Sequence, residues 1–125
     1  MNSSERVELV RRYCAGWSDK DRTLVEQLTA EDFHFTSPLD NRIDRATYFQ
    51  RCWPNSAHMQ VIDVKRALTD GDTVLITYEL TMKDGRRFRN TEAITVHDGL
   101  IHDVEVYFGW DLPHKAPAGG FVERL

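Results

Sequence analysis

A segment in the C-terminal half of the chain combines an alternating apolar pattern with two polar side chains that could do chemistry. Between residues 86 and 98, every second position belongs to one set, which reads Phe88, Asn90, Glu92, Ile94 and Val96. Such alternation predicts a strand with one face toward the core. An ionised carboxylate on that face is costly unless it is paired, so it usually has a partner or a raised pKa. Glu92 is therefore the first candidate for a catalytic residue, with Asn90 beside it to orient a ligand.

A second carboxylate comes from the preceding strand if the turn between the two strands takes its simplest form. Asp84-Gly85 is typical of two-residue hairpin turns. In that register Glu79 lies opposite Asn90 and is a diagonal neighbour of Glu92. Two carboxylates this close cannot both ionise easily, so one should keep its proton near neutral pH. We therefore expect Glu79 to raise the pKa of Glu92 and the pair to support acid–base chemistry.

A bulge in the strand would reverse this arrangement, and the sequence leaves both registers open. The bulge would turn Val74, Ile76, Tyr78 and Leu80 toward the core and send Glu79 to solvent. In the first register, these four apolar side chains lie with Tyr107 on the outer face of the sheet. An apolar stripe there predicts packing against a second copy of the chain, and so a homodimer.

The next turn predicts which side chains face this polar cluster. A three-residue loop at His97-Asp98-Gly99 would pair Glu92 with Val104, Asn90 with Val106, and Phe88 with Phe108. These partners would form an apolar wall around the carboxylate.

The elements that must position this wall follow from capping residues and periodicity. A first helix should begin at Asn2–Ser4 and include Tyr13 and Trp17, a second should run from Asp21 to near Glu31, and a third should run from Asp44 to Pro54. A short strand is expected at 33–37, and long strands at 58–68, 72–82, 87–97 and 100–108. Asp-Gly pairs between the long strands predict antiparallel hairpins. Residues 110–125 are rich in Pro and Gly and should be irregular.

Length and composition restrict the class of protein. The 125 residues fit a single domain, 1–125. The net charge of −4 and the absence of a basic stripe argue against a nucleic-acid partner. No apolar stretch is long enough to predict a membrane span or a secretory signal, so we expect a cytoplasmic protein. Cys14 and Cys52 are expected to be buried thiols rather than a disulfide.

No motif for a metal or cofactor is present. The histidines are widely spaced, with no HExxH pattern, and there is no phosphate-binding glycine loop or nucleophile elbow. We therefore expect no metal and no cofactor, which leaves cofactor-independent acid–base chemistry.

The order of elements resembles the SnoaL-like branch of the nuclear transport factor 2-like superfamily. The most specific pieces are Ala30-Glu31-Asp32 with Ser37-Pro38, and the stretch from Asp98-Gly99 to Tyr107-Phe108-Gly109. The resemblance implies an α+β cone, in which three N-terminal helices pack on a strongly curved, mixed but mostly antiparallel sheet and enclose a pocket. It also implies a homodimer formed through the outer face of the sheet.

This superfamily includes ketosteroid isomerase, polyketide cyclases, scytalone dehydratase, limonene epoxide hydrolase and non-catalytic members. Alignment with ketosteroid isomerase implies that Tyr13 is the donor to an oxyanion and that Glu92 lies near the acid kept protonated there. It also implies that Trp53 is a pocket aromatic. Ser37 stands where the catalytic aspartate belongs, and Asp40 could substitute only if its loop curls inward.

Two functions follow as hypotheses. The first is an isomerase, cyclase, dehydratase or hydrolase acting on a small, largely apolar carbonyl or hydroxyl compound, with Glu92, Tyr13 and Glu79 as catalytic groups. Its ligand-binding residues would be Trp17, Phe35, Ser37, Phe49, Trp53, His58, Phe88, Asn90, Val106 and Phe108. The second is a non-catalytic ligand-binding or dimerisation module in which Glu92 and Asn90 merely satisfy each other or a backbone group.

Overall fold

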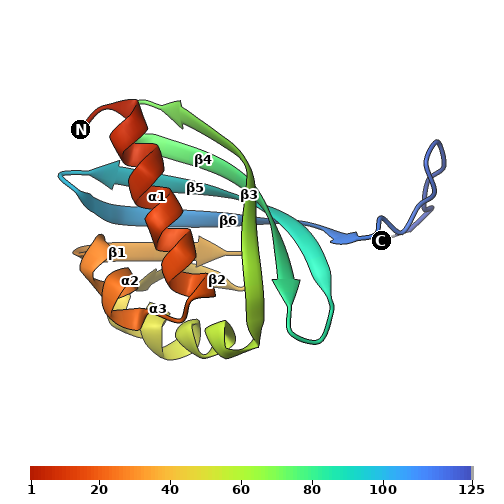
Figure 1. The fold of residues 1–125 in the computed structure, drawn as a ribbon, viewed down its shortest axis with the longest axis horizontal. Helices are drawn as coiled ribbons and strands as arrows, with labels where there is room; N and C mark the ends of the chain where they lie inside the picture. Colours follow the sequence, from red (N-terminus) through yellow and green to blue (C-terminus); the bar gives the residue numbers. More distant parts are fainter. Residues whose placement is uncertain (125) are drawn as a thin grey trace.

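The computed structural model describes residues 1–124 and shows an α+β architecture (Figure 1). The elements are, in order, α1 (Ser3–Ser18), α2 (Arg22–Leu28), β1 (Thr29–Ser37), β2 (Asp40–Asp44), α3 (Arg45–Arg51), the 3-10 helix η1 (Trp53–His58), β3 (Met59–Asp70), β4 (Thr73–Met82), β5 (Arg87–His97) and β6 (Leu100–Leu112). Within the described residues, no helix is both long and apolar enough to cross a lipid bilayer.

The strands form one mixed sheet in the order β2-β1-β6-β5-β4-β3. Only β1 and β6 run parallel; the other neighbours are antiparallel. The sheet is strongly curved but open, with β2 and β3 at its edges, and α1 crosses its concave side (Figure 1). The helices α2, α3 and η1 lie together at one end of that concave side. This arrangement confirms the predicted α+β cone.

Side-chain caps begin each α-helix where the sequence predicted them. Asn2 accepts a hydrogen bond from the Glu5 backbone N–H at 2.8 Å, and the Glu5 side chain accepts one from the Asn2 N–H, which completes a capping box. Asp21 and Asp44 cap α2 and α3 through bonds of 3.1 and 2.9 Å. Helical spacing then places Tyr13 and Trp17 on the buried side of α1, where each is less than a tenth exposed.

Several boundaries differ from the prediction because non-local pairing extends the strands. The helix α2 ends at Leu28 rather than near Glu31, since the chain from Thr29 pairs with β6. The strand β2 was not predicted, and β6 continues to Leu112 instead of ending at residue 108. The helix α3 stops at Arg51, so Trp53 belongs to η1.

The predicted register of the β4–β5 hairpin is wrong by one residue. The turn is a three-residue loop, 83–85, closed by a 2.8 Å bond from the Met82 N–H to the Arg86 carbonyl, and Gly85 has a φ of 92°. Glu92 therefore lies opposite Ile76, and Asn90 lies opposite Tyr78. One additional loop residue turns every side chain of β4 to the other face, which is the arrangement that the bulge alternative anticipated.

The second hairpin also differs, but it keeps its predicted faces. Asp98 and Gly99, with φ of 55° and 75°, form a two-residue turn, and a register shift follows after Thr95. As a result Glu92 lies opposite Val106, not Val104, and Asn90 lies opposite Phe108, not Val106. The predicted pairing of Phe88 with Phe108 is wrong as well, since Phe88 lies opposite Asp111.

This register overturns the sequence argument for an apolar outer stripe. Val74, Ile76, Tyr78 and Leu80 are 0 to 6% exposed and belong to the core beneath α1. The outer face of β4 instead carries Glu79, whose carboxylate pairs with Arg89 at 2.9 Å. Lys65 and Arg87 also lie within 4 Å of it.

Candidate functional site

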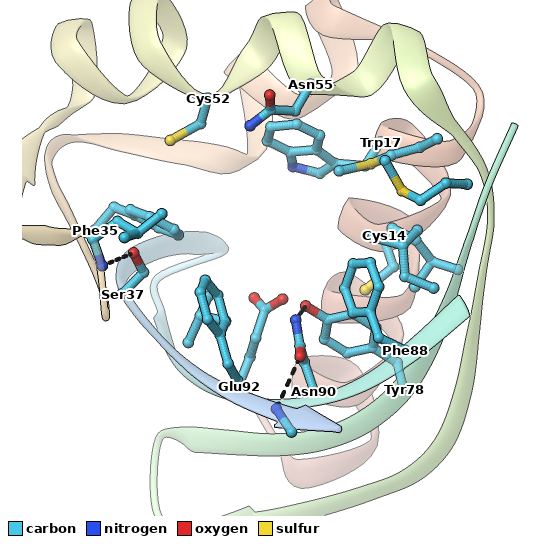
Figure 2. Close-up of a pocket in the computed structure, with 18 of the residues that line it drawn as sticks. Cys14, Trp17, Phe35, Ser37, Cys52, Asn55, Tyr78, Phe88, Asn90 and Glu92 are labelled. Atoms are coloured by element: carbon cyan, nitrogen blue, oxygen red, sulfur yellow. Dashed lines mark hydrogen bonds between the residues drawn. The ribbon is translucent and has the colours of Figure 1, made fainter. Parts of the chain in front are cut away.

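The concave side of the sheet and the helices enclose a cavity of about 500 Å³ (Figure 2). Nine of the thirteen catalytic and ligand-binding residues predicted from the sequence line it: Tyr13, Trp17, Phe35, Ser37, Phe88, Asn90, Glu92, Val106 and Phe108. The wall is mostly aromatic and aliphatic, with a few polar groups brought together from different elements. This composition is typical of a small-molecule site.

The Glu92 side chain points from β5 into the open space of the cavity, near Asn90 and Tyr78 (Figure 2). Burial raises the pKa of its carboxyl to about 7, and a hydrogen bond with the Tyr78 hydroxyl opposes this only in part. Glu79 takes no part in this shift, because it lies on the outer face. The prediction that Glu79 raises the pKa of Glu92 is therefore wrong. Desolvation of Glu92 raises this pKa instead.

A directed chain of two hydrogen bonds ends at the Tyr78 hydroxyl, near this carboxyl (Figure 2). The Gly109 backbone N–H donates to Asn90 Oδ1 at 3.1 Å, and Asn90 Nδ2 donates to the Tyr78 hydroxyl at 3.4 Å. A backbone N–H can only donate, so it fixes which end of the Asn90 amide faces Tyr78. The Tyr78 hydrogen is then free to point toward Glu92. Burial raises the pKa of the Tyr78 phenol, which keeps that hydrogen in place.

The residue that begins this chain of hydrogen bonds has to be glycine, because the surroundings of Gly109 leave no room for a side chain. A Cβ at this position would lie 1.9 Å from the Arg89 carbonyl oxygen. The register of β5 and β6 shifts between Phe88 and Asn90, so a bulge lies at this point. A bulge releases a backbone N–H from the sheet ladder, and here that N–H holds Asn90.

Two tyrosines from different helices form a second polar group on the cavity wall. The hydroxyls of Tyr13 on α1 and Tyr48 on α3 are hydrogen-bonded to each other. Burial raises the pKa of both phenols, so both keep their protons near neutral pH. One hydrogen lies between the two oxygens, and the other remains for a third group. Sequence reasoning missed Tyr48. It shares a face of the chain with Cys52, four residues later, but that spacing does not show that the face meets Tyr13.

A third polar group lies where β1 turns into β2. The loop curls inward, so the Asp40 side chain lines the cavity and is only 8% exposed. Ser37 Oγ donates to Asp40 Oδ2 at 2.8 Å, and the Arg51 guanidinium pairs with the other oxygen. The condition that the sequence set for Asp40 is thus met, but its carboxylate already has two partners.

Four predicted site residues lie outside the cavity lining. Phe49 faces away from it, with the guanidinium groups of Arg22 and Arg45 at 5.3 and 5.2 Å from its ring. Trp53 packs behind Trp17, with ring centroids 4.8 Å apart. The remaining two are His58, exposed at the end of η1, and Glu79. Phe49 follows Tyr48 directly in α3, and adjacent helix positions point in directions about 100° apart. Since Tyr48 faces the cavity, Phe49 does not.

The cysteines add no reactive group to the wall. Cys14 and Cys52 are both free and both line the cavity. Burial raises the pKa of the Cys52 thiol to about 11 and that of Cys14 further, so neither is a ready thiolate. Among residues 1–124, no three His, Cys, Asp or Glu side chains are grouped as metal ligands would be.

Comparison with solved structures shows the same fold in several bacterial proteins. A provisionally assigned ketosteroid isomerase from Kribbella flavida is 23% identical, with a TM-score of 0.75, over 98% of this chain and 90% of that one. An LEH-like epoxide hydrolase from M. tuberculosis is 20% identical, with a TM-score of 0.71, over 85% and 84% of the two chains. A provisionally assigned polyketide cyclase from Sinorhizobium meliloti is 20% identical, with a TM-score of 0.67, over 85% and 99%.

The sequence itself matches one family. The family model described as SnoaL-like domain matches residues 10–104. No curated protein sequence matches the chain. The resemblance inferred from the motifs is confirmed, and the chain belongs to the SnoaL-like domain family.

Proposed function

We propose that this protein is a cofactor-independent acid–base enzyme acting on a small, largely apolar carbonyl or hydroxyl compound. The observation that carries the proposal is the Glu92 carboxyl, which faces a cavity of about 500 Å³ and has a pKa raised to about 7. A group with this pKa is present in both protonation states near neutral pH. It can therefore take a proton in one step and return it in another.

The other polar groups support a proton transfer next to a carbonyl. In this mechanism, ionised Glu92 removes a proton from a carbon beside the ligand carbonyl. The carbonyl oxygen then gains negative charge, and the free O–H of the Tyr13–Tyr48 pair stabilises it by hydrogen bonding. Return of the proton from Glu92 to a different ligand atom completes an isomerisation. In a dehydration, Glu92 instead gives the proton to the departing hydroxyl group, which leaves as water while the carbon–carbon double bond forms.

The relatives support this reaction class only by analogy. One structural neighbour carries the name ketosteroid isomerase and another the name epoxide hydrolase, and both names denote chemistry on uncharged compounds. Ser37 stands where the resemblance places a catalytic aspartate, and Asp40 beside it is paired with Arg51. Glu92 is therefore the carboxyl to which we assign the proton transfer.

Solvent deuterium exchange tests this function without knowledge of the natural substrate. The ketone 2-tetralone has an apolar frame and exchangeable C–H bonds beside its carbonyl. We expect the protein to accelerate exchange of these hydrogens in D₂O, followed by NMR, and Glu92→Gln to reduce the acceleration by about 100-fold or more. Glu31→Gln is the matched control, because it removes an exposed carboxylate outside the cavity. Equal exchange by Glu92→Gln and the unmodified protein would contradict the role of Glu92.

A non-catalytic binding module is the second candidate. The pairing of Asp40 with Arg51 favours it, because that carboxylate is not free to act as a second acid–base group. Within the described residues, Glu92 is then the one cavity carboxylate that is neither paired nor at the exposed rim. A thermal shift on addition of 2-tetralone, with no deuterium exchange above background, would support binding alone.

We also propose that two copies pair through the outer face of the sheet and that the protein is cytoplasmic. Leu75, Tyr107 and Trp110 are 37, 54 and 51% exposed on that face. Light scattering of the protein and of Trp110→Ser tests the pairing, and cell fractionation tests the location. A monomeric mass for the unmodified protein would contradict the dimer.

A further inference from the structure

The charged residues that line the cavity all have the same sign. They are Asp40, Glu92 and Asp111, and no Lys, Arg or His of residues 1–124 lines the cavity with them. The chain is not short of cations, since it contains 16 Lys and Arg residues. Those cations lie elsewhere: Lys65, Arg87 and Arg89, for example, surround Glu79 on the outer face of the sheet.

The hydrogen-bonding groups around Glu92 are uncharged. They are Tyr13 and Cys14 on α1, Tyr48 on α3 and Tyr78 on β4. Burial raises the pKa of each, and the negative charge of Glu92 raises it further. They therefore remain neutral at pH values where Glu92 titrates. An anion that entered the cavity would find neutral donors but no cation, and it would meet the charge of Glu92 in surroundings that screen charge poorly.

At the rim, too, the charged residues that line the cavity are acidic. Arg51 contacts the lining residue Asp40, but its guanidinium is already bound to that carboxylate. Asp111 adds a carboxylate at the exposed end of β6. An approaching anion is thus opposed both at the entrance and inside.

We infer that the ligand of this cavity carries no anionic group, and that Glu92 is the residue that rejects carboxylates and phosphates in favour of uncharged ketones and alcohols. This inference rests on the proposed function and narrows its substrate class. Acidic compounds with the same apolar frame are excluded, although they would fit the space. The carbonyl or hydroxyl of the ligand takes the position that a carboxylate cannot occupy.

A matched pair of probes tests the inference. The alcohol 2-naphthalenemethanol and the anion 2-naphthoate share one frame and differ in charge, and calorimetry measures the affinity of each between pH 6 and 8.5. A naphthoate anion can enter only after Glu92 has gained a proton. Its affinity should therefore fall by up to about tenfold per pH unit above pH 7, while that of the alcohol changes little.

Two variants separate Glu92 from the rest of the protein. In Glu92→Gln the fall in naphthoate affinity with pH should disappear, and naphthoate should bind at pH 8.5 at least about tenfold more tightly than to the unmodified protein. Glu31→Gln should behave like the unmodified protein. The pH series on the unmodified protein is a test that does not depend on the folding of any variant.

The possible results distinguish this inference from the function beneath it. If naphthoate binds as tightly as the alcohol at pH 8.5, or if its affinity does not depend on pH, the inference is wrong while the proposed function stands. If 2-tetralone is exchanged and naphthoate is rejected, both stand. If neither the ketone, the alcohol nor the anion binds, both the proposed function and the inference are wrong.

Discussion

Replacing Glu92 by Gln should make the protein more stable at alkaline pH, even though it removes the proposed catalytic group. The pKa of this carboxyl is 4.5 in its ordinary state and about 7 in the folded chain. Between these values the folded state binds more protons than the unfolded state, so stability falls as the pH rises. A difference of about 2.5 pKa units corresponds to about 3 kcal/mol, present below pH 4.5 and lost by the time the pH exceeds 7.

The measurement is a double difference in the free energy of unfolding. Urea denaturation of the unmodified protein and of Glu92→Gln at pH 5 and pH 8 cancels the titration of all groups that the two proteins share. Gln keeps the size of Glu but cannot ionise. The stability of the variant relative to the unmodified protein should therefore rise by about 2 kcal/mol or more between the two pH values. The sign is unusual, because most carboxylates stabilise the folded state as they ionise.

The control again is Glu31→Gln, an exposed carboxylate whose stability difference should not change with pH in this way. Parallel pH profiles for Glu92→Gln and the unmodified protein would refute the reasoning. They would mean that the carboxyl at position 92 is as well solvated in the folded chain as in the unfolded one.

Three further predictions test other parts of the site. Gly109→Ala should destabilise the protein by about 2 kcal/mol or more and slow deuterium exchange of 2-tetralone, because its Cβ would meet the Arg89 carbonyl oxygen and displace the N–H that holds Asn90; urea denaturation and NMR measure the two effects. Glu79→Gln should leave the pH profile of that exchange unchanged, since Glu79 lies on the outer face. A shifted profile would support the original hypothesis that Glu79 raises the pKa of Glu92. Cys52 should react slowly with iodoacetamide at pH 7 and faster as the pH approaches 11, and rapid labelling at pH 7, detected by mass spectrometry, would contradict its raised pKa.

Local signals in the sequence were sufficient for the elements and for one face of the sheet. The capping residues Asn2, Asp21 and Asp44 gave the helix starts, since a cap acts within one turn. Alternation placed Glu92 and Asn90 on the concave face, because neighbouring residues of one strand keep their relation whatever the strand pairs with. These parts of the prediction did not depend on distant contacts.

The register between strands depended on loop length, which the turn residues do not reveal. The chain uses Asp-Gly three times, each time differently. Asp70-Gly71 contributes its glycine to a two-residue turn with Asp72, Asp84-Gly85 ends a three-residue loop, and Asp98-Gly99 forms a whole two-residue turn. Because the loop at Asp84-Gly85 has three residues rather than two, the prediction put Glu79 on the concave face and Tyr78 on the outer face, the reverse of what the structure shows.

Other missed features come from contacts between distant segments. The strand β2 and the start of β1 depend on pairing within the sheet, and β1 lies beside β6 although about 70 residues separate the paired positions Thr29 and Ile101. Tyr48 becomes part of the site only because α3 brings it to Tyr13. No pattern within a single element could predict either contact.

The bulge at Gly109 ties the two sides of the sheet wall together. Gly109 holds Asn90 inside the cavity, while the next residue, Trp110, lies over the Arg89 guanidinium on the opposite surface, 5.8 Å from its ring centroid. Two successive residues of β6 thus contact two successive residues of β5 from opposite sides. Any molecule that covers Trp110 would therefore lie one residue away from the backbone N–H that orients the Asn90 amide inside the cavity.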